Sequence, residues 1–578
     1  MCGIFLAIPK SSKQLDLEAC NKALNYLKKR GPDWHFNKVI NNKFFGQTVL
    51  SMTGDKRFNI QNHFSENKRF FTLFNGEIYN HKELGKKKIQ QKNFSDTFAL
   101  VNSYNPQKIE SLFNTLDGMF AVVIYDILKD KLIIARDMQG EKSLYIYEDK
   151  KIIIVSSEIN AIKIYIKKLK IDNYWLQTYL NSRHFLQLEN TIYENITIVQ
   201  PGQIFEVNKY NKIIHLNKIE IHNLVSENIY NYNSKRSEND LIEELEHIFR
   251  KNIKQMVPHN RPFCSILSGG VDSTLVSYYL SEISAPKKYF SLDHLGKDKI
   301  SNKIKKFQKY FNSEIKSLKI NENFYYKNLI KSLQICSSPI NSHDFPGKLI
   351  LAESAKKIKT KAIFGGDGAD ELFGGYETYI QRIKDHKINY SNYTKFINSK
   401  IRLSNKKDIF ENKLKKKWEQ CLKSYDFIKN KEDKNRLSMM LNDSSNQLSS
   451  VGLRGCDLMF MNHSIESRSL FLRKDVIKFA LNLPLKFKIN TNKANKFKTK
   501  IILKKIFLKY FPKNLLFKKQ GFSGFPNETK KKLGDLKNFK LNNLLFKTEK
   551  LNRKKLDKSS EWKIYNLEHF LRLNLNEK

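Results

Sequence analysis

The chain has 578 residues, a formal net charge of +45 at pH 7, and 40% hydrophobic and 12% aromatic residues. This length is too great for a single core and predicts two or more domains, and the apolar share excludes wholesale disorder. No run of about 18 apolar residues is present, so we expect neither a membrane span nor a membrane partner.

The positive charge does not form a pattern typical of nucleic-acid binding. Lysines are spread along the whole sequence with many Asn, Ile and Phe residues, and they lack regular interleaving with aromatics. We therefore expect no nucleic-acid partner. The six cysteines include no close pair, which argues against zinc-type spacing and a disulfide framework. The N-terminus does not resemble a signal peptide, and we expect a cytoplasmic protein.

The first third of the sequence predicts antiparallel β-structure with a few helices. Apolar residues at helical spacing predict a helix over 17–27 that ends before Gly31 and Pro32. The apolar run 70–74 predicts a strand that ends at Asn75 and Gly76. Two hairpins are expected, one joining 119–125 to 132–135 and the other joining 144–147 to 152–155. These elements favour a layered sheet domain.

A polar, Asn-rich stretch over 208–238 separates this region from the rest of the chain. We interpret it as a linker between a domain over 2–207 and a domain over 239–578. In the second domain, strands and helices alternate, with strands at 263–267, 288–292 and 362–364 and helices at 274–280 and 349–356. This alternation predicts a parallel sheet that holds ligands at the carboxyl ends of its strands. The stretch 385–450 is expected to form surface helices and loops.

The second residue is a candidate nucleophile. Removal of Met1 would leave Cys2 with its thiol and a free α-amine in the same residue. The α-amine has an ordinary pKa of about 7.7–8.0, so it can act as a base near neutral pH. A thiol beside such a base can be held as the reactive thiolate.

Two glycine-rich segments of the second domain indicate a phosphate site. The segment 268–273 lies between a predicted strand and helix, with two glycines that admit phosphate to backbone N–H groups and two serines that donate hydrogen bonds. It lacks the Gly-Lys-Ser/Thr ending found in kinases and GTPases. The segment 365–371 concentrates the carboxylates of Asp367, Asp370 and Glu371, which is costly unless cations neutralise them. Bound Mg–ATP would supply those cations.

These motifs, together with 30–34 (Arg-Gly-Pro-Asp-Trp) and 75–80 (Asn-Gly-Glu-Ile-Tyr-Asn), occur in an order that resembles the glutamine-hydrolysing asparagine synthetase family. The resemblance runs over nearly the whole chain. It implies an α+β N-terminal-nucleophile sandwich with αββα layers, followed by an α/β parallel-sheet domain of the ATP-pyrophosphatase type. It also implies glutamine, ATP and a carboxylate acceptor as substrates, with Mg²⁺ as cofactor and aspartate as the default acceptor, and it allows a homodimer.

The resemblance implies roles for residues of the first site. Cys2 would attack glutamine, releasing ammonia. The side chain of Asn75 and the backbone N–H of Gly76 would stabilise the oxyanion. Glu77 and Asp96 would hold the ammonium group of the substrate. Arg30 is interpreted as a structural anchor rather than a catalytic group.

It also implies roles for residues of the second site, where a carboxylate would become an acyl-adenylate with release of pyrophosphate. Asp367 matches a position linked to adenylate formation, and Lys500 matches a lysine that stabilises its transition state. Asp272 and Asp370 are the candidate Mg²⁺ ligands. The residues expected to bind the nucleotide are Leu267, Ser268, Gly269, Gly270, Asp272, Ser273, Leu292, Gly365 and Gly366.

The sequence departs from the family pattern at several positions. Val49 stands where the family has an arginine that clamps the α-carboxylate of glutamine, and valine cannot make that charged contact. Arg57 could replace it, backbone groups from Leu50 to residue 53 could suffice, or glutamine could bind poorly. Arg473 replaces a usual Asp, and serines 337–338 stand where acidic residues often precede a proline. We expect these last changes to affect the acceptor.

Two further functions stay open at this point. The same chemistry could act on another carboxylate, such as a uronic-acid sugar in surface-polysaccharide synthesis. Alternatively, the chain could be a catalytically inactive relative with a binding or regulatory role. The intact Cys2, Asn75, Asp272 and Asp367 favour an enzyme.

Overall fold

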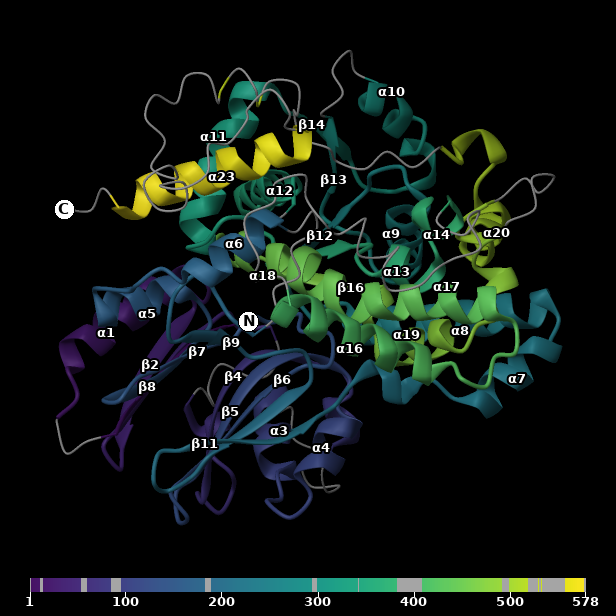
Figure 1. The fold of residues 1–578 in the computed structure, drawn as a ribbon. Coiled ribbons are helices and arrows are strands. Elements are labelled where there is room, and N and C mark those ends of the chain that lie inside the picture. Colours follow the sequence, from purple (N-terminus) through teal and green to yellow (C-terminus); the bar gives the residue numbers. More distant parts are fainter. Residues whose placement is uncertain are drawn as a thin grey trace.

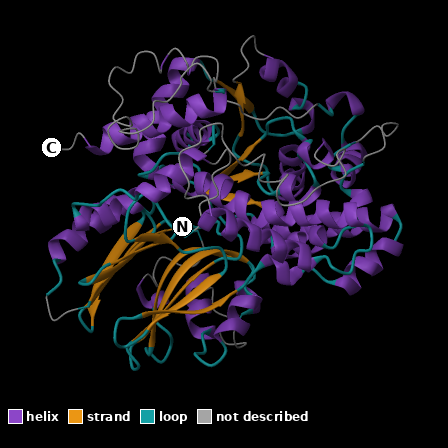
Figure 2. Ribbon diagram, in the orientation of Figure 1, coloured by secondary structure: helices purple, strands orange, loops and turns teal. Residues whose placement is uncertain are grey.

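The structure is a computed structural model with two sheet-based domains in contact (Figure 1). Figure 2 shows long strands gathered in the N-terminal domain and helices surrounding a smaller sheet in the second. The structure describes residues 2–10, 14–52, 60–84, 95–181, 189–293, 299–340, 342–381, 408–490, 498–517, 529, 532 and 557–575.

The N-terminal domain contains two antiparallel sheets. The first has the order β2 (Trp34–Ile40), β3 (Lys43–Val49), β1 (Cys2–Pro9), β8 (Ile152–Ser156), β7 (Tyr145–Glu148) and β9 (Ile196–Ile198). The second has the order β11 (Ile213–Lys218), β10 (Gln203–Val207), β6 (Lys131–Arg136), β5 (Gly118–Asp126) and β4 (Phe70–Ile78). Both predicted hairpins are confirmed, as β5–β6 and β7–β8.

The two sheets pack face to face through a buried apolar layer that includes Leu6, Phe45 and Phe71. Helices α1 (Leu17–Tyr26) and α5 (Ile159–Ile166) cover the outer face of the first sheet. Helices α3 (Asp96–Ser103) and α4 (Ile109–Thr115) cover the second, and the sandwich layers are visible in Figure 1. The predicted αββα sandwich is therefore confirmed.

Strand β4 extends further than the sequence predicts. Asn75 and Gly76 lie inside the strand and pair with Ala121 and Phe120 of β5, whereas we expected them to follow its end. The apolar run stops at Phe74, but hydrogen bonding to β5 continues to Ile78. The two residues are therefore held rigidly within a sheet rather than in a turn.

The segment 208–238 is more regular than a linker. Strand β11 completes the edge of the second sheet by pairing with β10, so this sheet extends beyond residue 207. Helix α7 (Glu227–Lys235) follows, with the Ser226 hydroxyl accepting a hydrogen bond from the N–H of Ile229 at its start. The polar composition reflects exposed faces of regular elements, which is why the sequence pattern misled us. The exact domain boundary stays a prediction.

The second domain is built on a five-stranded parallel sheet, as predicted. Its order is β14 (Ile315–Lys319), β13 (Tyr289–Asp293), β12 (Phe263–Ile266), β15 (Ala362–Gly365) and β16 (Glu466–Ser469). All four strand pairings are parallel. The predicted helices are α9 (Val271–Ile283), which directly follows the first glycine loop, and α12 (Phe345–Lys357).

Further helices surround this sheet. They are α8 (Glu238–Met256), α10 (Lys299–Lys305), α11 (Glu322–Cys336), α13 (Ala369–Phe373), α14 (Thr378–Gln381), α16 (Asp408–Ser424), α17 (Lys431–Asn442), α18 (Arg454–Met461), α19 (Lys474–Leu481), α20 (Ile501–Tyr510) and α23 (Lys558–Leu575). Helix α6 (Asn173–Asn181) packs instead in the apolar cluster of the first sheet of the N-terminal domain. A π-helical segment, η7 (Asp443–Leu453), joins α17 to α18. The second half of α17 is buried, so the predicted surface character of 385–450 is wrong there.

The C-terminal helix α23 connects the two domains. It packs against α11 of the second domain and against α6, which belongs to the N-terminal half of the chain (Figure 1). The Lys563 ammonium donates a hydrogen bond to the carbonyl oxygen of Tyr179 at 2.8 Å. Within the described residues, we find no helix with the length and apolar character that crossing a membrane requires.

Candidate active sites

Cys2 begins the central strand of the first sheet, directly opposite Val49 of β3. Only 6% of the residue is exposed. Its backbone N donates a hydrogen bond of 2.9 Å to Oδ1 of Asn75, which belongs to the other sheet. Burial raises the pKa of the Cys2 thiol, while the positive charge of the chain terminus and a hydrogen bond with Gln47 oppose that rise. Formation of the reactive Cys2 thiolate therefore depends on the α-amine at the chain terminus.

Asn75 has an unused hydrogen-bond donor beside this thiol. Its Oδ1 accepts from Cys2, but its Nδ2 is buried and has no hydrogen-bond partner among the described residues. A buried N–H group without a partner costs roughly 1–3 kcal/mol. Such a group is suited to a negative charge that develops only during reaction, as in an oxyanion hole.

Gly76 is required by the packing of the two strands around it. A Cβ at this position would lie 2.0 Å from the carbonyl oxygen of Met119 and 2.7 Å from Cα of Phe120, both on β5. These are backbone atoms of a paired strand, so they cannot move aside independently. We expected the backbone N–H of Gly76 to stabilise the oxyanion, and the close approach of β5 is a structural reason for a glycine at this position.

We expect Gly76→Ala to destabilise the protein. Overpacking costs about 1–3 kcal/mol, and because the clash is with backbone, the loss should be near 3 kcal/mol, or roughly 6–12 °C in Tm. Gly452→Ala is a suitable control, because its added Cβ would lie 3.4 Å from Leu448 in ordinary contact. Thermal melting measures both, and an unchanged Tm for Gly76→Ala would contradict the strand geometry.

The two carboxylates expected near the glutamine have different surroundings. Glu77 is buried, and its Oε2 lies 3.4 Å from Nη2 of Arg468 on β16 of the second domain. Asp96 begins α3, and its oxygens accept hydrogen bonds from the N–H groups of Ile78 and Thr97. Glu77 therefore already has a cationic neighbour from the other domain, which sequence reasoning missed because Arg468 is distant along the chain.

Val49 places no charge beside Cys2. The neighbouring Gln47 joins the two sheets instead, because its amide donates to the carbonyl oxygen of Phe74 (2.7 Å) and accepts from the N–H of the same residue (2.9 Å). Leu50, the residue that follows Val49, is buried. Arg57, our first alternative for the carboxylate clamp, lies outside the described residues.

The two glycine loops of the second domain lie against each other at the carboxyl ends of β12 and β15. In the first loop, the hydroxyl of Ser268 hydrogen bonds to that of Ser273 (2.9 Å), and Gly270 caps α9. In the second, a Cβ on Gly366 would lie 2.9 Å from Cβ of Asp272. The absence of a side chain at Gly366 therefore allows the two loops to touch.

One lysine joins the carboxylates of the two loops. The Lys500 ammonium pairs with Oδ2 of Asp272 and lies 2.6 Å from Oδ1 of Asp370. Although burial opposes it, the charges of these carboxylates raise the pKa of Lys500. Two carboxylates that share one cation are oxygen donors of the kind Mg²⁺ prefers, and phosphate and water usually complete such a site. The residues present therefore fit the predicted metal.

A cavity of about 390 Å³ opens between these loops, α12 and η7. Seven of the predicted residues line it, namely Ser268, Asp272, Ser273, Leu292, Gly366, Asp367 and Asp370. Leu267 does not line it, because its side chain belongs to the buried core.

The cavity also holds Glu371 of the second loop and an ion pair that the sequence did not single out. Tyr376 donates a 2.7 Å hydrogen bond to Glu371, and burial together with the charge of Asp370 raises the pKa of Glu371 to about 7. Asp344 and Lys348 form an ion pair of 2.8 Å on the wall made by α12. Their spacing of four residues is common on exposed helices, so it gave no signal of a site.

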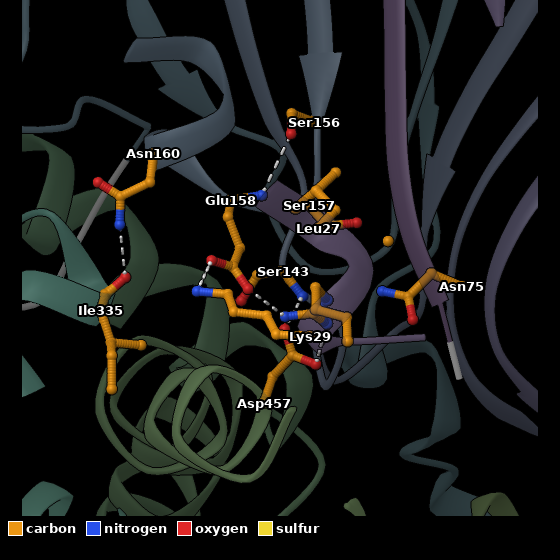
Figure 3. A network of polar contacts seen from close by, with 12 residues as sticks. Leu27, Lys29, Asn75, Ser143, Ser156, Ser157, Glu158, Asn160, Ile335 and Asp457 are labelled. Carbon is orange, nitrogen blue, oxygen red and sulfur yellow. Dashed lines mark hydrogen bonds and ion pairs between the residues drawn. The ribbon is translucent and has the colours of Figure 1, made fainter. Parts of the chain in front are cut away.

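Arg30 links Cys2 to the second domain, as an anchor would. Its Nε donates to the carbonyl oxygen of Cys2 (3.1 Å), its Nη1 to Glu158 (3.2 Å) and its Nη2 to Asp457 of α18 (2.8 Å). Figure 3 shows this polar network, in which Glu158 also pairs with Lys29 and Asp457 approaches from the helix of the other domain. The arginine is completely buried.

The unusual residues Arg473, Ser337 and Ser338 lie at the domain interface. Arg473 pairs with Asp117 of the N-terminal domain at 2.6 Å. Ser337 hydrogen bonds to Tyr193, and Ser338 accepts a hydrogen bond from Arg454. None of these three lines the cavity, so our expectation that they affect the acceptor finds no support in their positions.

The fold defines a two-domain protein in which an N-terminal-nucleophile sandwich is joined to a parallel-sheet domain of the ATP-pyrophosphatase type. A family model described as glutamine amidotransferase domain matches residues 1–216, and one described as asparagine synthase matches 244–569, more than half of the chain. The chain belongs to the asparagine synthase family. It is a ligase of the glutamine-hydrolysing asparagine synthetase type.

Several relatives match the chain at low identity. The chain is 25% identical over 431 residues to a probable glutamine-hydrolysing asparagine synthetase of Acanthamoeba polyphaga mimivirus, covering 72% of this chain and 73% of that protein. It is 27% identical over 404 residues to a putative one of Methanocaldococcus jannaschii, covering 66% and 76%. It is 24% identical over 565 residues to asparagine synthetase 3 of Bacillus subtilis, covering 90% and 86%.

Proposed function

We propose that the chain converts aspartate to asparagine, with glutamine as nitrogen donor and ATP cleaved to AMP and pyrophosphate. The names of its relatives support aspartate as the acceptor. Hydrolysis of glutamine is supported by one observation above all, the buried Nδ2 of Asn75, which has no hydrogen-bond partner among the described residues. The same side chain accepts a hydrogen bond from the Cys2 nitrogen through its Oδ1.

In the first site, the α-amine of Cys2 accepts the thiol proton, and the thiolate attacks the side-chain carbonyl of glutamine. Nδ2 of Asn75 and the N–H of Gly76 donate to the oxyanion that forms. Ammonia leaves, and water hydrolyses the thioester to glutamate. Asp96 and Glu77 hold the ammonium group of glutamine, and for Glu77 this contact would compete with Arg468.

In the second site, the Ser268–Ser273 loop and the N-terminus of α9 bind the phosphates of ATP. Asp272 and Asp370 would hold Mg²⁺, whose charge helps to neutralise the leaving pyrophosphate. Lys500 lies between these carboxylates and supplies a positive charge to the phosphates. The acceptor carboxylate attacks the α-phosphate near Asp367, and ammonia then displaces AMP to give the amide.

The test of this function is a panel of carboxylates assayed for ATP-dependent release of AMP, with either glutamine or ammonium chloride present. We expect aspartate to show the highest kcat/KM. A higher value for a uronic-acid sugar would replace asparagine synthesis with the alternative, in which the same chemistry serves surface polysaccharides. If neither aspartate nor the uronic-acid sugar supported release of AMP, both assignments of the acceptor would be wrong.

Val49 predicts weak binding of glutamine. An arginine clamp on a carboxylate contributes on the order of 1.5–3 kcal/mol, equivalent to roughly ten- to 150-fold in binding. Val49→Arg should lower the KM for glutamine by up to that factor and leave ammonia-dependent turnover unchanged. Val49→Met, which adds length without charge, is the control.

A micromolar KM for glutamine in the natural protein would contradict this expectation. Another group would then hold the carboxylate, and Arg57→Ala should raise that KM.

A further inference from the structure

The cavity between the glycine loops has an unbalanced set of charges. Among the described residues that line it are five carboxylates, those of Asp272, Asp344, Asp367, Asp370 and Glu371, and one basic side chain, Lys348. Lys500 serves the Asp272–Asp370 end from outside this lining. A carboxylate-bearing substrate that enters such a cavity needs a cation, and Lys348 is the one that faces it.

Lys348 is held so that part of its charge remains available. Its Nζ lies 2.8 Å from Oδ2 of Asp344 and donates at 2.8 Å to the carbonyl oxygen of Gly452 in η7. Oδ1 of Asp367 lies 3.9 Å away, which is too far for a hydrogen bond, and the remaining neighbour of the ammonium is the thiol of Cys456, which is only a weak acceptor. An ammonium group has three donors, so one can turn toward the cavity.

Asp344 also faces the cavity with an unused atom. It is the N-cap residue of α12, yet its side chain makes no capping hydrogen bond, although aspartate commonly does so at this position. Its Oδ2 pairs with Lys348, and the hydroxyl of Ser342 is a further hydrogen-bonding neighbour of the carboxylate, whereas its buried Oδ1 has no close hydrogen-bond partner among the described residues. Although burial opposes it, the charge of Lys348 lowers the pKa of Asp344, so the carboxylate is ionised.

A cation whose third donor meets only a weakly accepting thiol, beside a carboxylate with an unused oxygen, matches the two charges of an α-amino acid head group. The pair lies on the α12 wall, and Lys348 approaches Asp367, where the proposed function places adenylate formation. A four-carbon amino dicarboxylate is short enough to present its distal carboxylate there while its head group meets the pair. A uronic acid offers no ammonium group and no second carboxylate.

We propose that Asp344 and Lys348 recognise the head group of an α-amino dicarboxylic acid, Lys348 binding its α-carboxylate and Asp344 its ammonium group. This inference rests on the proposed function, because it takes the cavity as the site of adenylation. It names specificity-determining residues that neither the sequence motifs nor the ATP loops include.

The experiment compares three acceptors with ammonium chloride as nitrogen donor, so that the glutamine site is not involved. Aspartate has both groups of the head, β-alanine lacks the α-carboxylate, and succinate lacks the ammonium group. Release of AMP gives kcat/KM for each acceptor. In the natural protein, aspartate should exceed both of the others.

Lys348→Met should reduce the aspartate to β-alanine ratio by roughly ten- to 150-fold, the value of a charged hydrogen bond, with less effect on the β-alanine rate. Asp344→Asn should reduce the aspartate to succinate ratio in the same way. Lys357→Met removes an exposed lysine of the same helix, paired with Glu353, and should change neither ratio. The KM for ATP should stay constant in all three variants.

If Lys348 had a purely structural role, Lys348→Met would lower kcat/KM for all three acceptors by the same factor. That result would overturn the proposal. So would equal use of aspartate, β-alanine and succinate by the natural protein. Failure of the proposed function looks different, because no carboxylate would then support release of AMP. Lys348→Arg, which keeps the charge, should recover part of the aspartate to β-alanine ratio if the contact is ionic.

Discussion

Replacement of Cys2 by alanine should abolish glutamine-dependent formation of the amide, by about 10⁴-fold or more, because the nucleophile is lost. Formation from ammonium salts should continue at the natural rate. The thiol lies in the N-terminal sandwich, and the residues that line the ATP cavity come from the other domain. The substitution removes one sulfur atom and leaves the hydrogen bond from the Cys2 nitrogen to Asn75 in place.

Two measurements make this result decisive. Two samples are assayed, one with glutamine and one with ammonium chloride as nitrogen donor. Release of glutamate and release of AMP are followed in each. Cys20→Ala is the matched control, because Cys20 is an equally buried cysteine of the same domain, on α1. If a folded Cys2→Ala protein lost both activities, the division of labour between the domains would be wrong.

The second large effect is expected at Asp272. Asp272→Asn keeps the size of the side chain and removes its charge, so that among the described residues Lys500 keeps Asp370 as its one close carboxylate. Release of AMP and pyrophosphate should fall by about 10²–10³-fold, as for the loss of a group that stabilises charge in the transition state. Hydrolysis of glutamine alone should persist, because Cys2 and Asn75 are unchanged.

The control for this variant is Asp475→Asn, which removes an exposed aspartate paired with Lys251 on the surface. Product analysis by chromatography distinguishes the mechanisms. If ADP and orthophosphate were the primary products of the natural protein, adenylation would be excluded, whatever the effect of the substitution.

Local patterns in the sequence predicted most of the architecture. Alternation of apolar residues and short polar turns predicted both hairpins of the sandwich, and strand–loop–helix alternation predicted the parallel sheet. Strand β4 was predicted too short because its last residues, including Asn75 and Glu77, are polar although they are buried. Their place in the sheet depends on pairing with β5, which a single strand cannot reveal.

Contacts between the domains could not be predicted, because they join residues far apart in the sequence. The pairing of Glu77 with Arg468 and that of Asp117 with Arg473 each combine two ordinary charged residues that only the fold brings together. Arg473 was therefore interpreted through the family pattern alone, and its pairing with Asp117 at the domain interface was missed. Lys348 was missed for the same reason, since its partner Gly452 lies 104 residues away.

The ion pair between Arg30 and Asp457 has a consequence for the way in which the protein is made. The two residues are 427 positions apart, and both side chains are completely buried. At about 5–20 residues per second, a ribosome needs roughly 20 to 85 seconds to travel from one to the other. Glu158 follows Arg30 by 128 residues, so for the later part of that time Arg30 has Glu158 but not its second counter-ion.

A buried arginine that lacks one partner is costly, so the nascent sandwich should stay loosely closed around the carbonyl oxygen of Cys2 until α18 has been synthesised. The glutamine site would then mature only when the rest of the enzyme exists. An incomplete nascent chain would not hydrolyse glutamine, and ammonia would first be released when the domain that consumes it has been synthesised.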